Sequence, residues 1–113
     1  MSDYFVNPLG VLEEQILVAV IRTGDEAYGM EVRREIERVT GREMAIGAVY
    51  STLDRLEAKG MLKSSRVMVD DQSRRRFELT RVGAHALNET RSMRERLWRG
   101  VDLRGLVALA GGR

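Results

Sequence analysis

Apolar residues recur at helical spacing in three successive segments of the N-terminal half. Residues 9–22 carry the first set, at Leu9, Leu12, Ile16, Ala19 and Val20. Residues 27–41 carry the second, at Val32, Ile36 and Val39, and Gly41 is a typical helix stop. Steps of three and four residues collect side chains on one face of a helix. We therefore expect two helices with one core face each, the first opened by Pro8.

The third helical segment, residues 45–60, has two contrasting faces. Its predicted core face consists of Ile46, Val49, Leu53 and Leu56, and Gly60 ends it. The opposite face is small and polar and consists of Gly47, Ser51, Asp54, Arg55 and Ala58, with Tyr50 on its flank and Lys59 near the end. Taken alone, such a face is more typical of a helix that meets only water. It is also a face that could approach another molecule closely, so the neighbouring segments decide.

A change of period after Gly60 predicts a β-hairpin. The stretch LKSSRVMVDDQSRRRFELT, residues 62–80, has β-branched and alternating residues on both sides of the turn-rich cluster DDQS at 70–73. In the second strand, Phe77 and Leu79 should point one way and Arg74, Arg76 and Glu78 the other.

A long final helix should follow, from about Arg81 toward Gly100, with Thr80 as its N-cap. Its apolar stripe has near-heptad spacing and consists of Ala86, Leu87, Thr90, Met93, Leu97, Trp98 and Val101. This stripe is too apolar for water, so we expect two copies to pair through it. The tail 102–113 could add a short apolar turn.

The order of helix, helix, helix, hairpin and long helix predicts a mainly α fold with a small β-hairpin, a winged helix-turn-helix. Residues 1–80 would form the DNA-binding domain and residues 81–113 a C-terminal dimerisation helix. In helix-turn-helix proteins the second helix of the motif enters the major groove. A homodimer would then read an inverted-repeat operator in double-stranded DNA.

The candidate DNA-binding residues come from the third helix and the hairpin. They are Gly47, Tyr50, Ser51, Arg55, Lys59, Lys63, Arg66, Ser73, Arg74, Arg75 and Arg76. Guanidinium groups bind phosphate in bidentate fashion, so a protruding RRR cluster suits duplex DNA. Alternatively, charge on an edge strand only prevents strand pairing. The helix order favours the DNA interpretation.

Composition narrows the remaining function classes. The 113 residues include no cysteine and one histidine, His85, which excludes disulfides and thiolate or multi-histidine metal sites, and we expect no cofactor. The formal net charge of +2 does not by itself indicate a polyanion partner. No nucleophile and base, paired carboxylates or phosphate-cradling loop is evident, so we expect no enzymatic activity. No apolar run spans a bilayer and no secretion signal opens the chain, which predicts a cytoplasmic protein.

The sequence resembles the PadR-like transcriptional regulators. The matching segments are LGVLEEQIL at 9–17, AYGMEVRREIE at 27–37, GAVYSTLDRLEAKGMLKSS at 47–65 and RRRFELTRVGAHAL at 74–87. The resemblance implies a winged helix with one C-terminal dimerisation helix, as in the small subgroup, and repression of genes until a small molecule or stress releases the operator. Ser51 stands where the family usually has proline, and the hairpin turn lacks the frequent glycine.

Trp98 allows two interpretations. Together with Met93, Leu97 and Val101 it could anchor the dimer, because tryptophan buries a large area. It could also line a site between protomers for a planar aromatic or phenolic effector, a use that the resemblance also implies. Two rival functions stay open. One is a winged-helix module that binds ligand or protein without reading DNA sequence. The other is a MarR-type regulator, which the short N-terminal extension disfavours.

Overall fold

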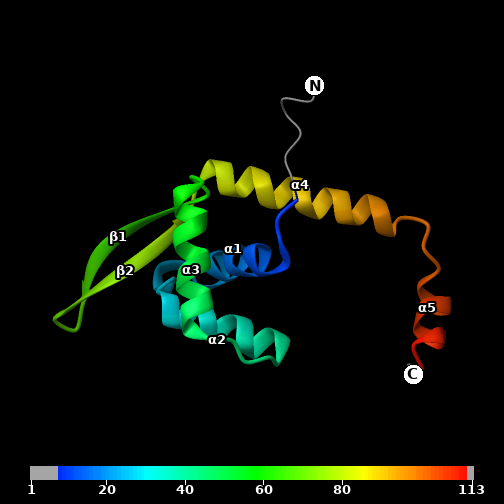
Figure 1. Ribbon diagram of the computed structural model, residues 1–113, viewed down its shortest axis with the longest axis horizontal. Helices are drawn as coiled ribbons and strands as arrows, with labels where there is room; N and C mark the ends of the chain where they lie inside the picture. The colour runs from blue at the N-terminus through cyan, green and yellow to red at the C-terminus, as the bar shows by residue number, and fades with distance from the viewer. Residues whose placement is uncertain (1–7, 112–113) are drawn as a thin grey trace.

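The computed structural model describes residues 8–111, and its elements follow the expected order (Figure 1). The helices are α1 (Val11–Thr23), α2 (Gly29–Thr40), α3 (Ile46–Ala58), α4 (Arg81–Trp98) and α5 (Leu103–Leu109), with a short 3₁₀ turn, η2 (Gly24–Glu26), between α1 and α2. The strands β1 (Leu62–Val69) and β2 (Gln72–Leu79) form one antiparallel hairpin, hereafter the wing. The fold is therefore mainly helical with a small hairpin, as predicted.

Helices α1, α2 and α3 surround one core, to which the base of the wing contributes. Its fully buried side chains include Ile16, Leu17, Val32, Val49, Leu53, Leu56 and Phe77. The predicted core faces are confirmed with one exception. Val39 is 57% exposed, because it lies in the last turn of α2, beyond the part of that helix that the core covers.

Local signals set most helix ends. Gly41 ends α2 in the left-handed conformation at φ 72°, and the Thr80 side chain accepts a hydrogen bond from the Gly83 N–H at 3.1 Å, as a capping threonine should. The first helix begins at Val11 rather than at Pro8. Gly10 takes an extended conformation before it, and its N–H donates to Glu13 Oε1 at 3.0 Å.

The wing is a tight hairpin whose turn is shorter than predicted. Only Asp70 and Asp71 form the turn, at φ 50° and 64°, whereas Gln72 and Ser73 already pair with Val69 and Met68. Two successive left-handed residues are what a two-residue hairpin turn requires, and aspartate tolerates them better than most side chains. At its base the wing is tied to the body, since the Phe77 N–H donates to the Ala27 carbonyl at 2.9 Å.

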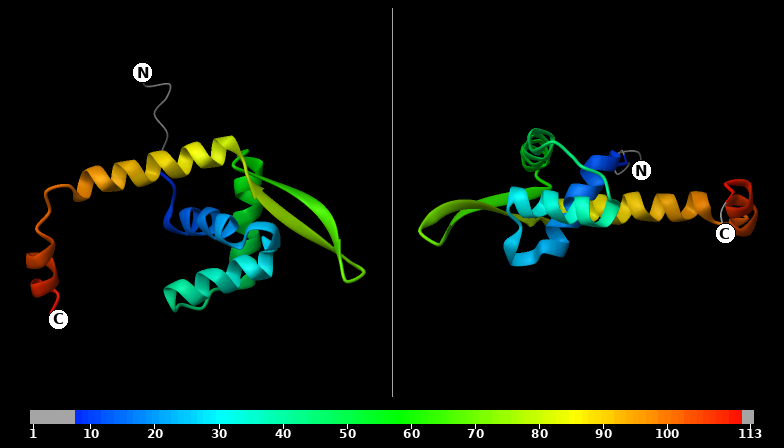
Figure 2. Two further views of the ribbon diagram at one scale, coloured as in Figure 1. Left: turned by 180° about the vertical axis from the view of Figure 1, so that it is seen from behind. Right: turned by 90° about the horizontal axis from the view of Figure 1, so that it is seen from below.

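Helix α4 contacts the body as far as Arg94, which pairs with Glu14 of α1, and not beyond it. Ala86 and Thr90 are buried within the chain, and Thr90 Oγ1 accepts a hydrogen bond from the Leu9 N–H at 3.1 Å. The prediction that these two residues face a partner is therefore wrong, since they pack beneath the segment that leads into α1. The end of α4 and all of α5 extend away from the body in every view (Figure 2).

None of the helices within residues 8–111 combines the length and the apolar character needed to cross a bilayer.

Two glycines provide a test of this packing. A Cβ at Gly83 would overlap the backbone carbonyl of Met61, where α4 starts against the wing, whereas a Cβ at Gly47 would meet open space. We expect Gly83→Ala to lower the free energy of unfolding by about 1–3 kcal/mol, the usual cost of overpacking. Gly47→Ala should raise it by about 0.5 kcal/mol, because alanine favours the helix. Urea unfolding measures both, and equal effects would contradict the close approach at Gly83.

Candidate nucleic-acid interface

Helix α3 carries its predicted small polar face on the outside of the body. Gly47 and Ser51 are exposed and Tyr50 is 38% exposed, while Val49, Leu53 and Leu56 fix the opposite face in the core. Among the described residues, apart from the neighbours of Gly47 and the backbone of its own helix, no group lies within 4 Å of where a side chain at this position would start. Another molecule can therefore approach the backbone of α3 closely on its exposed side.

A cleft of about 370 Å³ joins α3 to the wing and to the start of α2. We call it the wing cleft, and its lining residues are Tyr28, Gly29, Met30, Tyr50, Arg66, Ser73, Arg74 and Arg75. Five of them, Tyr50, Arg66, Ser73, Arg74 and Arg75, are among the candidates expected from the sequence. The fold thus brings together side chains that lie up to 25 positions apart.

Tyr50 is positioned by a glycine at the start of α2. A Cβ at residue 29 would overlap the Tyr50 ring, so only the absence of a side chain there lets the phenol lie against the α2 backbone. Tyr28 precedes α2 without making a side-chain cap, so the first N–H groups of the helix have no partner within it. The wing cleft therefore has backbone donors and the positive end of a helix dipole at one side.

The arginines of the wing lie in different surroundings. The Arg74 guanidinium lies over the Tyr28 ring, 4.0 Å from its centre, which holds it at the cleft. Within residues 8–111, no carboxylate lies within ion-pair distance of Arg66, Arg74 or Arg76. These three side chains keep their charge uncompensated.

Arg75, by contrast, is bound to its own protein. It lies on the strand face that also carries Phe77, and its nitrogens donate to Asp54 at 2.8 Å, to Glu57 at 2.5 Å and to Ser64 Oγ at 3.1 Å. The guanidinium also lies 4.6 Å from the centre of the Phe77 ring. Arg75 thus connects the wing to the carboxylates of α3, and most of its donors are used.

Three further candidates are also paired with carboxylates. Lys59 and Arg55 lie 3.0 Å and 3.5 Å from Glu13 Oε2 on α1, and Lys63 lies 3.7 Å from Glu78 across the wing. All three basic side chains are about half exposed or more, and exposed pairs of this kind are weak. They lie outside the wing cleft.

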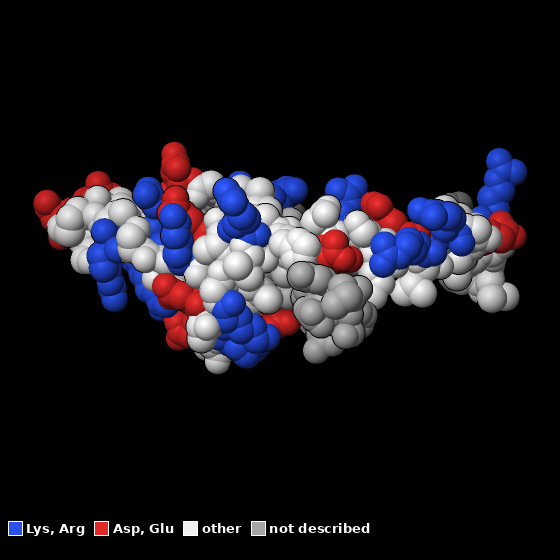
Figure 3. Space-filling view, turned by 90° about the horizontal axis from the view of Figure 1, so that it is seen from above, with Lys and Arg blue, Asp and Glu red and all other residues white. Residues whose placement is uncertain are grey.

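The surface charge alone does not single out this site. On the face that carries α4, basic side chains are spread over the length of the molecule and alternate with acidic ones (Figure 3). The two uncompensated arginines at the wing cleft, Arg66 and Arg74, matter more than the net charge.

Tyr28, Gly29, Asp54 and Glu57 contribute to this region although the sequence did not predict them as site residues. Gly29 carried a usable signal, since a glycine inside a helical pattern destabilises the helix relative to alanine and points to a packing reason. Asp54 and Glu57 lie 21 and 18 positions from Arg75, so no local pattern relates them.

The candidate dimer and effector residues lie elsewhere. Met93 is half-buried on α4, whereas Leu97, Trp98 and Val101 are exposed near its end, Leu97 by 72% and Trp98 by 51%. The structure brings these residues together at the far end of α4 but not with the wing cleft.

Comparison with known proteins gives one consistent result. Residues 16–89 match the Transcriptional regulator PadR-like family. A transcriptional regulator of Mycobacterium tuberculosis, Rv3488, is 39% identical over 77 residues, which are 68% of this chain and 71% of that protein.

Solved structures agree with this match. RosR of H. salinarum is 25% identical and has a TM-score of 0.65, over 91% of this chain and 94% of its own. A PadR family transcription regulator from Clostridium difficile R20291 shares the fold at a TM-score of 0.63 and 22% identity, over 91% of this chain and 100% of its own.

The bridge between α3 and the wing should be sensitive to acid. Hydrogen bonds from Arg75 and Ser64 lower the pKa of Glu57 below its usual 4.5. A lowered pKa in the folded state means that the carboxylate stabilises the fold above about pH 4.5 and that this contribution is lost as the pH falls below it. We expect Glu57→Gln to be less stable at neutral pH and to lose less stability on acidification than the parent protein.

Thermal unfolding between pH 7 and pH 3 measures this effect. Glu43→Gln is the matched control, because Glu43 is exposed and makes no ion pair within the described chain. Parallel curves for Glu57→Gln and the parent protein would contradict the role of the bridge.

Proposed function

Because the chain belongs to the PadR-like family of transcriptional regulators, whose members are not enzymes, we propose that it is a homodimeric repressor that binds operator DNA. The observation that carries this proposal is the wing cleft, where the exposed face of α3 meets the uncompensated Arg66 and Arg74 of the wing. Such a repressor would act in the cytoplasm, where its operator is. Residues 1–80 would bind DNA and residues 81–113 would pair the protomers.

In this proposal α3 enters the major groove with Gly47, Tyr50 and Ser51 toward the bases. The major groove is wide enough for a helix and displays a distinct pattern for each base pair. Gly47 lets the α3 backbone come close, and Tyr50 is held in place by Gly29. These side chains would supply sequence preference.

The wing would hold the phosphate backbone beside that groove. In the described part of the chain no carboxylate pairs with Arg66, Arg74 or Arg76, and the first N–H groups of α2, which have no partner within that helix, lie at the wing cleft. Both kinds of donor bind phosphate oxygens without reading sequence. Arg75 would instead keep the wing at a fixed angle to α3.

The distal half of α4 would form the dimer contact, through Met93, Leu97, Trp98 and Val101. The body leaves Leu97, Trp98 and Val101 exposed, and Met93 is half-buried on the same helix. A two-fold dimer presents two recognition helices, so the operator should be an inverted repeat with half-sites about one helical turn, or a multiple of it, apart.

The proposal also includes an effector, a planar aromatic or phenolic compound that releases the repressor from its operator. It is supported by the exposure of Trp98 near the end of α4, at the proposed dimer contact. Bordetella bronchiseptica BpsR, a solved structure with the same fold, is a protein whose DNA binding is regulated by 6-hydroxynicotinic acid. An effector works only if it binds the released and DNA-bound states with different affinity.

The alternative function is a winged-helix module that binds a ligand or a protein and does not read DNA. A mobility shift with the DNA upstream of its own gene separates the two. A shift that unrelated DNA does not compete away supports the repressor, and no shift favours the module.

The wing arginines should differ in their effect on the salt dependence of DNA binding. Removal of one phosphate contact takes about 0.9 from the slope of log K against log salt, so Arg74→Ala and Arg76→Ala should each flatten the curve by about that amount. Arg75→Ala should weaken operator binding while leaving the slope nearly unchanged, because Arg75 is committed to Asp54 and Glu57. Fluorescence anisotropy over a salt series measures both. A decrease in slope for Arg75→Ala as large as for Arg74→Ala would refute the distinction.

Trp98 separates a packing role from a ligand-binding role. If it lines an effector site, planar aromatic cations or phenolic acids should quench its fluorescence and release the operator. Trp98→Ala, shown by light scattering to remain dimeric, should then need much higher concentrations of the same compounds for release. Release of the variant at unchanged concentrations, or the absence of any quenching compound, would leave Trp98 as packing only.

A further inference from the structure

Helix α5 is an apolar helix without a packing partner among residues 8–111. Leu103, Leu106 and Val107 lie on one face, at the i, i+3 and i+4 positions, and all three are exposed. We call these residues the α5 face. Asp102 caps the helix through the Gly105 N–H at 3.1 Å, and α5 stands apart from the body beyond the end of α4 (Figure 1). A helix of seven residues is not stable in water alone, so it needs a surface to pack on.

The body has an uncovered apolar surface of matching kind between α1 and α2. Helix α1 carries apolar residues on its outer side as well as on its core side, since Val11 and Val18 are exposed there. Together with Ile36 and Val39 of α2 they line a groove of about 400 Å³, the α1–α2 groove. This groove also explains why Val39 is exposed although its spacing predicts a core position.

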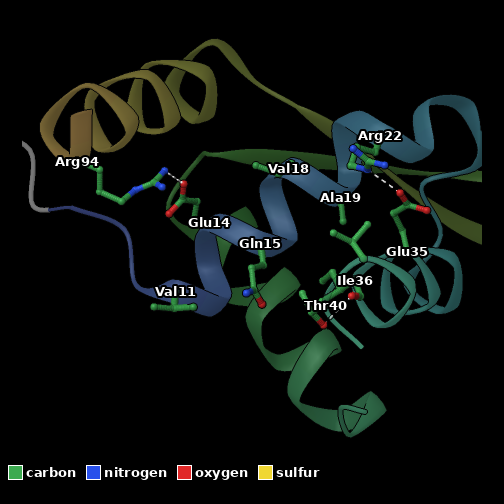
Figure 4. Close-up of a pocket in the computed structure, with 11 residues that line it drawn as sticks. Val11, Glu14, Gln15, Val18, Ala19, Arg22, Glu35, Ile36, Thr40 and Arg94 are labelled. Atoms are coloured by element: carbon green, nitrogen blue, oxygen red, sulfur yellow. Dashed lines mark hydrogen bonds and ion pairs between the residues drawn. The ribbon is translucent and has the colours of Figure 1, made fainter. Parts of the chain in front are cut away.

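The charged groups around the groove are already paired. Figure 4 shows Arg94 of α4 bound to Glu14 on one side and Arg22 bound to Glu35 at 2.5 Å on the other. Arg38 and Arg22 together lower the pKa of Glu35 to about 2, so this carboxylate stays charged and paired. The groove therefore presents an apolar floor with no net charge at its rim. It suits an uncharged face better than a charged one.

We propose that the α1–α2 groove of one protomer receives the α5 face of a second copy of this chain. The inference rests on the proposed homodimer and adds a second, exchanged contact to the one made by α4. The charge match supports it, since the only charged residue within α5, Arg104, lies at the edge of the α5 face. The exposed end of α4, with Leu97 and Trp98, forms an apolar link between the first contact and the second.

The amount of exposed surface also favours a second copy. The chain exposes 8178 Å², whereas a compact monomer of its 12.8 kDa exposes about 6,300 Å². The surplus is on the order of 2,000 Å², an upper value because the exposed area is summed over all 113 residues. It exceeds the roughly 800 Å² that each partner buries in a standard interface. The radius of gyration of 16.7 Å likewise exceeds the about 13 Å of a compact domain of this length.

Cysteine pairing tests the proposal directly, because the chain contains no cysteine of its own. One chain carries Val39→Cys in the groove, and a second chain, with a different affinity tag, carries Leu106→Cys on α5. Both positions are exposed, so the substitutions leave the core intact. After the two chains are denatured, mixed and refolded, oxidation should link the mixed dimers through a disulfide. Met68→Cys, at an exposed position on the distant wing, replaces Val39→Cys in the control and should give no link.

A chain with both Val39→Cys and Leu106→Cys identifies the occupant. A covalent dimer supports exchange between copies. Loss of both thiols at monomer mass shows that α5 folds back into its own groove, and free thiols show that the groove takes something else, such as a small apolar molecule. Either result overturns the inference. Native mass and the operator shift are measured on the same samples: a DNA-binding dimer without the link refutes only the α5 contact, whereas a monomer refutes the proposed homodimer.

Discussion

The orientation of the wing depends on one half-buried guanidinium. Arg75 reaches from β2 to Asp54 and Glu57 of α3, so the strand that carries the free arginines and the helix that carries Tyr50 cannot rotate independently. The Phe77 side chain beneath it anchors the same strand in the core. Because a bridge of this kind is worth most when its partners are partly removed from water, its position matters as much as its short distances. The shape of the wing cleft therefore depends on this bridge between β2 and α3.

In the rest of the molecule, some apolar surfaces are buried within the chain and others are exposed. The three-helix core buries its apolar residues within the chain, and Ala86 and, in part, Leu87 of α4 are buried with it. The outer side of α1, the end of α4 and α5 do not bury theirs. A chain of this size has little core to spare, and leaving so much apolar surface in water would cost more than a small domain can offset. These exposed apolar surfaces are therefore where the proposed dimer would form.

Features that depend on neighbours along the chain were predictable from the sequence, whereas those that depend on distant residues were not. The Thr80 cap, the Gly41 stop, the hairpin and the core residues of α3 follow from local chemistry and periodicity. The three arginines at 74–76 look alike in sequence, yet carboxylates on α3 bind only the middle one. Val39, Ala86 and Thr90 fit the same apolar spacing as their neighbours. Their exposure or burial depends on where a helix runs past the body, which spacing does not encode.

Because of the turn at Asp70 and Asp71, the wing is negatively charged at its tip and positively charged nearer the body. Both carboxylates stand at the tip, where the backbone turns through two left-handed residues, whereas the uncompensated arginines lie several residues back toward the body. A polyanion would be attracted to the base of the wing and repelled by its tip, since like charges at close range oppose approach even in salt. In the proposed complex this repulsion would keep the tip of the hairpin out of the DNA grooves. The hairpin would then lie alongside the phosphate backbone.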